Sequence, residues 1–332
     1  GEASILAILM MIFGVAILLL NQISVKSRKS YTTVTGKSGQ ISKFNLGRSG
    51  KYIIAIILII ITFFTSIFPI VSFAFETFLP NPGDYSFLYT GDPDNLTTKW
   101  WVTNENITEN GMYGQQGILY NDMIWHAYKG TIMVSVCCAL TAGTIGTLIG
   151  YAVSKNRRSR WANYVNSMAF LPYLMPSIAV GVAFFILFSN KYVNLFNTYA
   201  LLIIVGTVKY IPFASRSSLN SMLQLSGEIE EAAIIQDIPW TKRMTRIIIP
   251  IQKTSIISGY LLPFMTCLRE LSLFILLCVQ GFILSTTLDY FDEMGLYAFS
   301  SGINLILIVT ILICNALVNK ATGASLDKGI GG

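Results

Sequence analysis

Charged residues are scarce in this chain, and their scarcity excludes a soluble domain of ordinary composition. Asp, Glu, Lys and Arg make up 12% of the 332 residues, whereas hydrophobic residues make up 53% and the mean hydropathy is +0.59. Several apolar runs reach the length of about 20 residues that a helix needs to cross a bilayer. The composition therefore predicts an integral membrane protein whose spans are helices.

The residues that carry most metal and enzyme chemistry are also few. The chain has a single histidine, His126, at the end of a polar segment, and its five cysteines lie inside apolar runs without Cys-x-x-Cys or Cys/His spacing. The sequence contains no Gly-x-x-x-x-Gly-Lys-Ser/Thr loop for nucleotide phosphates. The net charge of +6 comes from basic residues in short loops, which orient membrane spans. We therefore expect no metal site, no bound cofactor, no ATPase activity and no nucleic-acid partner.

The signs of the loop charges predict the topology. Seven spans are expected, at residues 3–25, 52–75, 130–153, 161–190, 196–215, 254–280 and 295–319. The segments 26–50 and 155–160 carry only basic charges and are placed in the cytoplasm, whereas the acid-rich segments 76–129 and 289–293 are placed outside. Lys209 is expected near the inner end of the fifth span, where its side chain can reach the interface.

A charged stretch between the fifth and sixth spans has the features of two short helices that meet at a corner. Ser226 is a favoured helix cap, and the acidic residues that follow it complement the helix dipole. This helix is expected to end near Asp237, which tolerates the left-handed conformation of many helix ends. Pro239 fits the first turn of the next helix.

The same stretch resembles the cytoplasmic loop of binding-protein-dependent ABC importer permeases. The family pattern is Glu-Ala-Ala, three residues, Gly, nine residues and Ile-x-Leu-Pro, and the chain departs from it where Asp237 replaces the glycine and Ile249 the leucine. The resemblance implies an ATPase-coupling site made of Glu230, Glu231, Ala232, Ala233, Asp237, Pro239, Ile247, Ile249 and Pro250. The alternative is an amphipathic helix that lies on the membrane interface.

The resemblance also implies an organisation and a set of partners. Residues 51–320 would form an all-α permease domain of the type I importer kind, with six of the seven spans, a coupling loop at 226–253 and a cytoplasmic tail at 321–332. Such a permease lies in the bacterial inner membrane. It works with ABC ATPase subunits that use ATP and Mg, with an extracytoplasmic substrate-binding protein and with a second permease half.

The linker at 26–50 narrows the resemblance. Its sequence around residues 31–39 looks like the junction between the halves of fused permeases in the ferric-iron importer group, which suggests ferric iron as the substrate. The span at 1–25 would then end a preceding half, and further spans are expected before Gly1. Phosphonate and polyamine importers share this style of permease, so the substrate stays open.

Four residues inside the predicted spans are candidates for the translocation path or for a lock between helices. Pro172 and Pro176 remove backbone donors and free carbonyls one turn earlier, so the fourth span is expected to kink. Arg269 and Glu270 would be costly unpaired in hydrocarbon, so they are expected to face the bundle interior. A secondary transporter that uses Glu270 for ion coupling is the alternative function, although no inverted repeat is evident.

Two further patterns concern packing. Ala142, Gly146 and Gly150 recur at four-residue spacing in the third span, which is typical of a face that lets another helix approach closely. The acid-rich segment at 76–129 contains three tryptophans and several tyrosines. This segment is predicted either to help dock a substrate-binding protein or to cap the bundle with interfacial aromatic residues.

Overall fold

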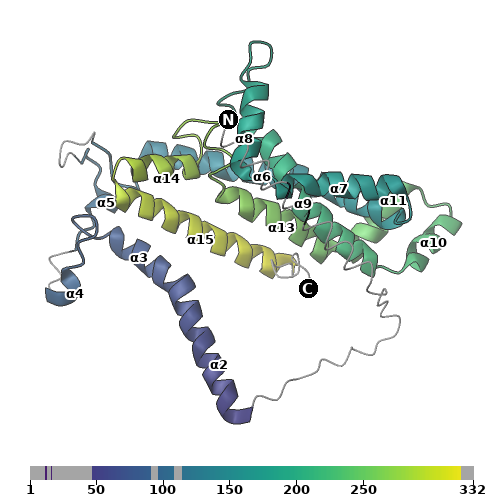
Figure 1. The fold of residues 1–332 in the computed structure, drawn as a ribbon, viewed down its shortest axis with the longest axis horizontal. Coiled ribbons are helices and arrows are strands. Elements are labelled where there is room, and N and C mark those ends of the chain that lie inside the picture. The colour runs from purple at the N-terminus through teal and green to yellow at the C-terminus, as the bar shows by residue number, and fades with distance from the viewer. Residues whose placement is uncertain (1–11, 13–15, 17–46, 91–95, 108–113, 323–332) are drawn as a thin grey trace.

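The computed structural model describes residues 12, 16, 47–90, 96–107 and 114–322 (Figure 1). These residues are helical apart from turns, loops and two isolated bridges, between Ile107 and Gln115 and between Ser189 and Asn194. The all-α class is therefore confirmed. Nearly all of the predicted leading span at 1–25, of the linker at 26–50 and of the tail at 321–332 lies outside the described residues.

Four helical runs are long and apolar enough to cross a membrane. They are the run α2 (Gly47–Thr62), η1 (Phe63–Ile67) and α3 (Phe68–Glu76), then α6 (Asp122–Lys155), α9 (Tyr199–Gln224) and α15 (Tyr297–Thr322). Two bent pairs of helical segments could each form one further span. The first pair is α7 (Arg160–Leu174) with α8 (Ser177–Phe188). The second is the run α11 (Trp240–Arg243), η3 (Met244–Ile248) and α12 (Ile249–Ile251) with α13 (Lys253–Leu268). The described part of the chain thus holds four to six candidate spans.

Helices α6 and α9 pack along their length at the centre of the bundle, and α13 lies against both. A Cβ atom on Gly146 would lie 2.5 Å from the Cβ of Ala214, and one on Gly150 would lie 2.7 Å from the backbone nitrogen of Leu219. Because side chains there would collide with α9, the small residues allow the two backbones to approach. The predicted close-packing face on α6 is confirmed.

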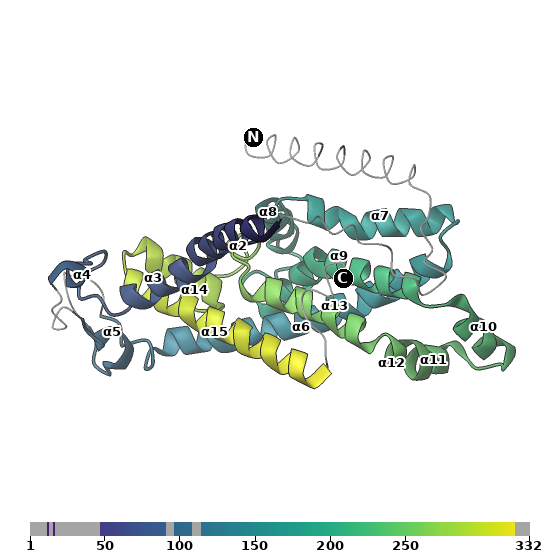
Figure 2. The same cartoon turned by 90° about the horizontal axis from the view of Figure 1, so that it is seen from below.

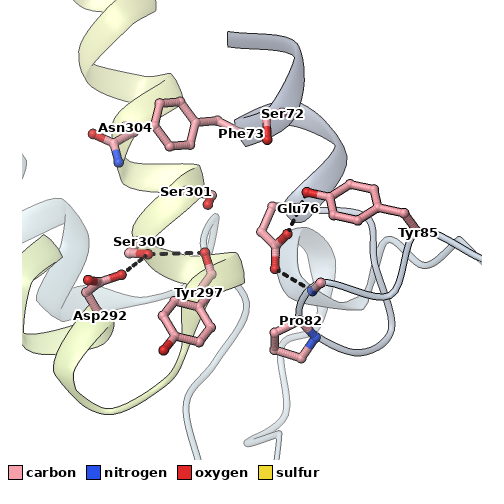
Figure 3. Close-up of a pocket in the computed structure, with 11 residues that line it drawn as sticks. Ser72, Phe73, Glu76, Pro82, Tyr85, Asp292, Tyr297, Ser300, Ser301 and Asn304 are labelled. Carbon is pink, nitrogen blue, oxygen red and sulfur yellow. Dashed lines mark hydrogen bonds between the residues drawn. The ribbon is translucent and has the colours of Figure 1, made fainter. Parts of the chain in front are cut away.

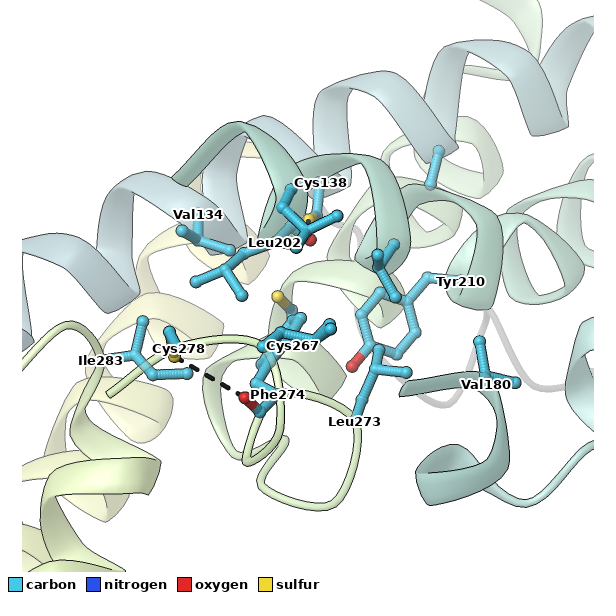
Figure 4. Close-up of a cluster of buried hydrophobic side chains, with 14 residues drawn as sticks. Val134, Cys138, Val180, Leu202, Tyr210, Cys267, Leu273, Phe274, Cys278 and Ile283 are labelled. Atoms are coloured by element: carbon cyan, nitrogen blue, oxygen red, sulfur yellow. Dashed lines mark hydrogen bonds between the residues drawn. The ribbon is translucent and has the colours of Figure 1, made fainter. Parts of the chain in front are cut away.

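The main hydrophobic core lies between α6, α8, α9 and the turns that follow α13 (Figure 4). Three of the five cysteines, Cys138, Cys267 and Cys278, are buried in this cluster beside Phe274 and Tyr210. They therefore act as small apolar packing residues, as their surroundings in the sequence predict.

The first described span differs from the others because it packs weakly. None of its most hydrophobic 18-residue window is buried, whereas 56% of the corresponding window of α9 is buried. In Figure 1, α2 leans away from the bundle while α3 lies beside α15, and α3 and α15 are in contact. The apolar side chains of α2 thus face outward, toward lipid or another protein in a membrane.

The segment that follows the first span is fastened to the bundle by aromatic residues. The Nε1 of Trp100, in α5 (Lys99–Val102), donates to the carbonyl of Leu79 at 2.7 Å, and its ring lies 5.9 Å from that of Phe299 in α15. Ile118 and Ile124 belong to the same buried hydrophobic cluster as Trp100 and Phe299, here called the outer cluster. The geometry favours the capping role for this segment.

Two predicted spans are interrupted. Helices α7 and α8 are bent by 101° at Met175–Pro176, so the fourth span is broken where a kink was expected. Helix α13 ends at Leu268 and turns follow up to Ile283, so the prediction of one helical span over 254–280 is wrong. Arg269 and Glu270 lie at the end of α13 and not within a helix. Short α14 (Leu284–Glu293) occupies the predicted acidic outer turn.

The charged corner and the aromatic outer segment lie at opposite ends of the molecule. Figures 1 and 2 both show α10 (Gly227–Ile235) and α11 at one end, and α5 with α4 (Phe87–Thr90) at the other. This arrangement agrees with a topology that places the two segments on different sides of the membrane.

Candidate functional site

The corner is built by local backbone rules. The Oγ of Ser226 accepts from the backbone N–H of Glu228 at the start of α10. At the other end, Asp237 has a φ of +53° and donates its N–H to Ile234, while Ile238 donates to Ala233. These two bonds satisfy carbonyls that the helix end leaves free. The predicted start and end of this helix are confirmed.

Pro239 lies one residue earlier than expected. It occupies the cap position with an extended ψ of 150°, and α11 begins at Trp240. The missing N–H of proline is harmless at this position, as it would be within the first turn, because the first N–H groups of a helix have no partner within it.

The predicted coupling residues do not form one continuous surface. Most of those at the tip are exposed, whereas Ile247 and Ile249 are half-buried, and Glu230 and Ala233 are buried within the chain at 6% and 5% exposure. The exposed members are Glu231, Ala232, Asp237, Pro239 and Pro250. The side chains that a partner can reach are therefore a subset of the motif.

Glu230 is held by the C-terminal end of α6. The hydroxyl of Tyr151 donates to its Oε1 at 2.5 Å, and Lys155 forms an ion pair with its Oε2. Burial alone would raise the pKa of Glu230. Hydrogen bonds from Lys155 and Tyr151 and the positive charges of Lys155 and Arg243 outweigh burial, so the pKa lies below its ordinary value. Glu230 is therefore an ionised, paired carboxylate.

Large apolar side chains are exposed on the outer surface of the corner. Ile235 is 82% exposed and Ile234 is 49% exposed, and Trp240 and Ile229 are also open. On the inner side, Met222, Met244, Ile248 and Ile256 form a separate hydrophobic cluster that attaches the corner to α9 and α13. The corner is thus anchored on one side and presents apolar residues on the other.

A second polar group lies at the broken helix. Lys209, in the middle of α9, is 8% exposed, and its Nζ donates to the carbonyls of Pro172 at 3.0 Å and Met175 at 2.6 Å. The expectation that Lys209 reaches the interface is wrong. Because Pro176 has no N–H to offer the carbonyl four residues earlier, the break leaves acceptors that the ammonium group satisfies.

Glu270 is bonded to several parts of the bundle. Its Oε2 accepts from the hydroxyl of Tyr210 at 3.0 Å, its Oε1 accepts from the backbone N–H of Leu273 at 3.1 Å, and its carbonyl accepts from Ser285. It also attracts Lys209 electrostatically. Arg269 is exposed. These contacts favour a helix lock for Glu270, whereas they assign no such role to Arg269.

Outside these two groups, a pocket of about 450 Å³ opens at the outer end between α3 and α15 (Figure 3). Glu76 accepts from the backbone N–H of Gly83 and from the hydroxyl of Tyr85, and Asp292 accepts from Ser300. Both carboxylates are thus held by donors of the chain itself.

Residues 142–324 match the model of a family described as binding-protein-dependent transport system inner membrane component. The chain belongs to this family. The matched region contains both the corner and the broken helix. Family membership places the protein in the inner membrane as a component of a binding-protein-dependent transport system.

Individual relatives differ in what their names say they transport. The chain is 24% identical over 279 residues to a putative ferric transport system permease protein, FbpB 1, of Haemophilus influenzae, covering 83% of this chain and 40% of that protein. It is 26% identical over 204 residues to the putrescine permease PotI of Escherichia coli K12, covering 59% of this chain and 68% of PotI. The chain therefore spans about 40% of the length of the ferric relative.

Solved structures show the same fold. A bacterial ABC transporter that imports the acidic polysaccharide alginate has a chain that superposes with a TM-score of 0.60 at 16% identity, over 82% of this chain and 98% of that chain. The same kind of transporter in complex with an alginate-bound periplasmic protein gives a TM-score of 0.59. The all-α importer-permease fold class predicted from the resemblance is confirmed, whereas the number of spans in the described residues stays at four to six.

Sequence reasoning missed the partners of the charged residues. Lys155 and Tyr151 stand four residues apart at the end of a predicted span, a spacing that places them on one helix face. Lys209 is a charge inside an apolar run whose partners lie 34 and 37 residues away along the chain. The first signal was present in the sequence, whereas the second required the fold.

Proposed function

We propose that this chain is a permease subunit of an ATP-driven importer and that its corner at 226–253 binds a separate ABC ATPase. The observation that carries the proposal is the exposed apolar surface of a corner that lies at one end of the bundle. Ile234, Ile235 and Trp240 are each large, apolar and exposed, and exposed apolar residues gathered in one segment are typical of contact with another protein.

The chemistry of the corner suits a docking surface. Its interior is anchored by the cluster around Met244 and Ile248, so it can transmit force without unfolding. Ala232 is small and exposed, and Glu231 beside it is an exposed carboxylate for a basic partner residue. ATP and Mg would be used by that partner, which supplies the energy.

An amphipathic helix resting on the membrane is a weaker explanation. Such a helix needs one continuous apolar face. In α10 the exposed residues include the acidic Glu228 and Glu231 as well as apolar residues, and the helix is only nine residues long. A surface of this kind fits a shaped partner better than a lipid layer.

The remaining partners and the substrate follow from the family as proposals. An extracytoplasmic binding protein and a second permease half would complete the importer, and the outward-facing α2 offers an apolar surface for the second half. Ferric iron is the substrate that we propose, because the relative named for ferric transport matches 83% of this chain, whereas PotI, which is named for putrescine, matches 59%. Secondary transport through Glu270 is less well supported, because Tyr210 and Leu273 already bind that carboxylate.

The test is the variant Ile235→Asp in the complete importer. Ile235 makes few contacts with its own chain at 82% exposure, so a charge there should leave the fold intact and should release the ATPase during copurification. Val193→Asp is the matched control, because Val193 is an exposed aliphatic residue in the loop between α8 and α9.

Two outcomes separate the alternatives. Loss of the ATPase from Ile235→Asp but not from Val193→Asp supports docking at the corner. Equal recovery of the ATPase with both variants, together with unchanged uptake, would show that the corner does not dock. Ala233→Leu is a less direct test, because Ala233 is buried and a larger side chain would disturb the loop itself.

A further inference from the structure

We propose that Glu230 is a positioning residue that ties the corner to α6, so that movement of the corner is passed to α6 through Tyr151 and Lys155. This inference rests on the proposed function, because it assigns the path of a movement that ATPase docking would start. It concerns a contact between two segments that are 79 residues apart in the chain.

The three acidic residues of α10 differ sharply in their surroundings. Glu228 and Glu231 are exposed, whereas Glu230 is 6% exposed and turns toward α6. A carboxylate is buried only when charges and donors compensate for the water it loses. Tyr151 and Lys155 supply that compensation from positions four residues apart, which share one face of α6.

The contact between Glu230 and Tyr151 is reinforced by the packing of the Tyr151 ring. The ring of Trp240 lies 6.2 Å from that of Tyr151, and Tyr151 also packs against the cluster of Met222, Met244 and Ile248. Tyr151 therefore contacts both helices of the corner, one through its hydroxyl and the other through its ring. A displacement of the corner must either carry the end of α6 with it or break a charged hydrogen bond.

Helix α6 is the element best placed to carry such a displacement. The corner is joined covalently to α9 and α13 only, and the Glu230 contact adds α6, which packs along α9. At the far end of α6, Ile124 and Ala127 belong to the outer cluster, and Thr131 accepts from the backbone N–H of Leu284 at 2.7 Å. One helix of 34 residues, about 50 Å long at 1.5 Å per residue, thus links the corner to the outer end.

The experiment uses the complete importer reconstituted with its ATPase and binding protein, and measures substrate transported per ATP hydrolysed. Glu230→Gln keeps the size of the side chain and removes its charge, and Tyr151→Phe removes the donor. We expect each to lower transport per ATP about tenfold, in line with loss of one charged hydrogen bond. ATPase copurification should not change. Glu228→Gln is the matched control on the same helix and should behave as the unaltered protein.

Double variants distinguish a specific contact between Glu230 and α6 from a general loss of packing. The double variant Glu230→Gln with Tyr151→Phe should lose less coupling than the two single losses combined, because both substitutions weaken the attachment of the same side chain to α6. Exchanging the charges, with Glu230→Lys and Lys155→Glu together, should restore part of the coupling that Glu230→Lys alone abolishes. Partial recovery of this kind would not follow if the residues only filled space.

The failure of this inference differs from failure of the proposed function. Unchanged transport per ATP in Glu230→Gln and Tyr151→Phe, with Ile235→Asp still releasing the ATPase, would overturn the tie and leave the docking corner in place. Release of the ATPase by Glu230→Gln would also overturn it, because Glu230 would then belong to the docking surface. If Glu230→Gln does not accumulate, the transport per ATP of Tyr151→Phe tests the inference on its own.

Discussion

The corner and the broken helix both hold charged residues at low exposure, but they compensate those charges differently. At the corner, Glu230 is paired with the opposite charge of Lys155 and with the hydroxyl of Tyr151. At the broken helix, Lys209 is satisfied mainly by backbone carbonyls that prolines and a helix end leave open. A pair of side chains can separate and re-form, whereas an ammonium group bound to a backbone break fixes the shape of the helix itself. The comparison suggests a movable contact at the corner and a rigid one inside the bundle.

The largest effect is expected for Lys209→Met. Methionine fills similar space but offers no donor, so the carbonyls of Pro172 and Met175 would be left without their bonds in a site that excludes water. An unsatisfied buried acceptor costs about 1–3 kcal/mol, so the loss of both bonds should cost about 2–6 kcal/mol of stability. Thermal unfolding of the purified protein in detergent measures this loss.

Lys191→Met is the control for that prediction. Lys191 lies in the exposed loop after α8, and removing its charge should leave the unfolding temperature nearly unchanged. Equal stability of both variants would show that the ammonium group of Lys209 does not hold the break, and the proposed rigidity of this region would be wrong.

A smaller effect is expected for Glu270→Gln. The amide oxygen can still accept one of the two bonds from Tyr210 and Leu273, but the charge that attracts Lys209 is lost. We expect a loss of about 1–2 kcal/mol, since bonds to charged groups are stronger than bonds between neutral groups. Thermal unfolding beside the exposed Glu293→Gln variant would reveal it.

The double variant Lys209→Met with Glu270→Gln tests whether the two residues interact. If the two residues attract each other, the double variant should lose less stability than the sum of the single losses. Additive losses would show that each residue serves only its own backbone partners. Lys209 and Glu270 would then stabilise the bundle independently of each other.

The two regions also differ in how far the sequence predicted them. The two ends of α10 were predicted from the sequence, because the cap at Ser226 and the left-handed end at Asp237 depend on neighbours within a few positions. The break at Pro176 was anticipated as a kink for the same local reason. No local rule gives its size of 101°, or the donor from another helix, Lys209, that satisfies its carbonyls.

The segment that follows Glu270 shows a second limit of prediction from the sequence. Hydropathy alone extends the sixth span to residue 280, because the residues after the Arg-Glu pair are again apolar. In the structure these residues form turns within the main core, where Leu273, Phe274 and Leu277 are buried. A run of apolar residues predicts burial, but it does not distinguish a helix from turns packed inside a bundle.

The smallest effect is expected for Asp237→Gly, which restores the residue of the family pattern. Asp237 has a φ of +53°, where a non-glycine residue is strained, and glycine relieves this strain of about 1–2 kcal/mol. The greater freedom of glycine in the unfolded chain costs about 0.5–1 kcal/mol, so the net gain should not exceed about 1.5 kcal/mol.

Asn197→Gly is the matched change at the other positive-φ residue that is not glycine in the described part of the chain, with a φ of +58°. The relief of strain is similar there, but the Asn197 Oδ1 accepts from the backbone N–H of Val279 at 3.0 Å, and glycine loses that bond. We therefore expect Asp237→Gly to be neutral or slightly stabilising in thermal unfolding and Asn197→Gly to be neutral or destabilising. A marked loss of stability in Asp237→Gly would mean that its carboxylate, and not only its backbone, holds the corner, and the corner would then depend on more than local rules.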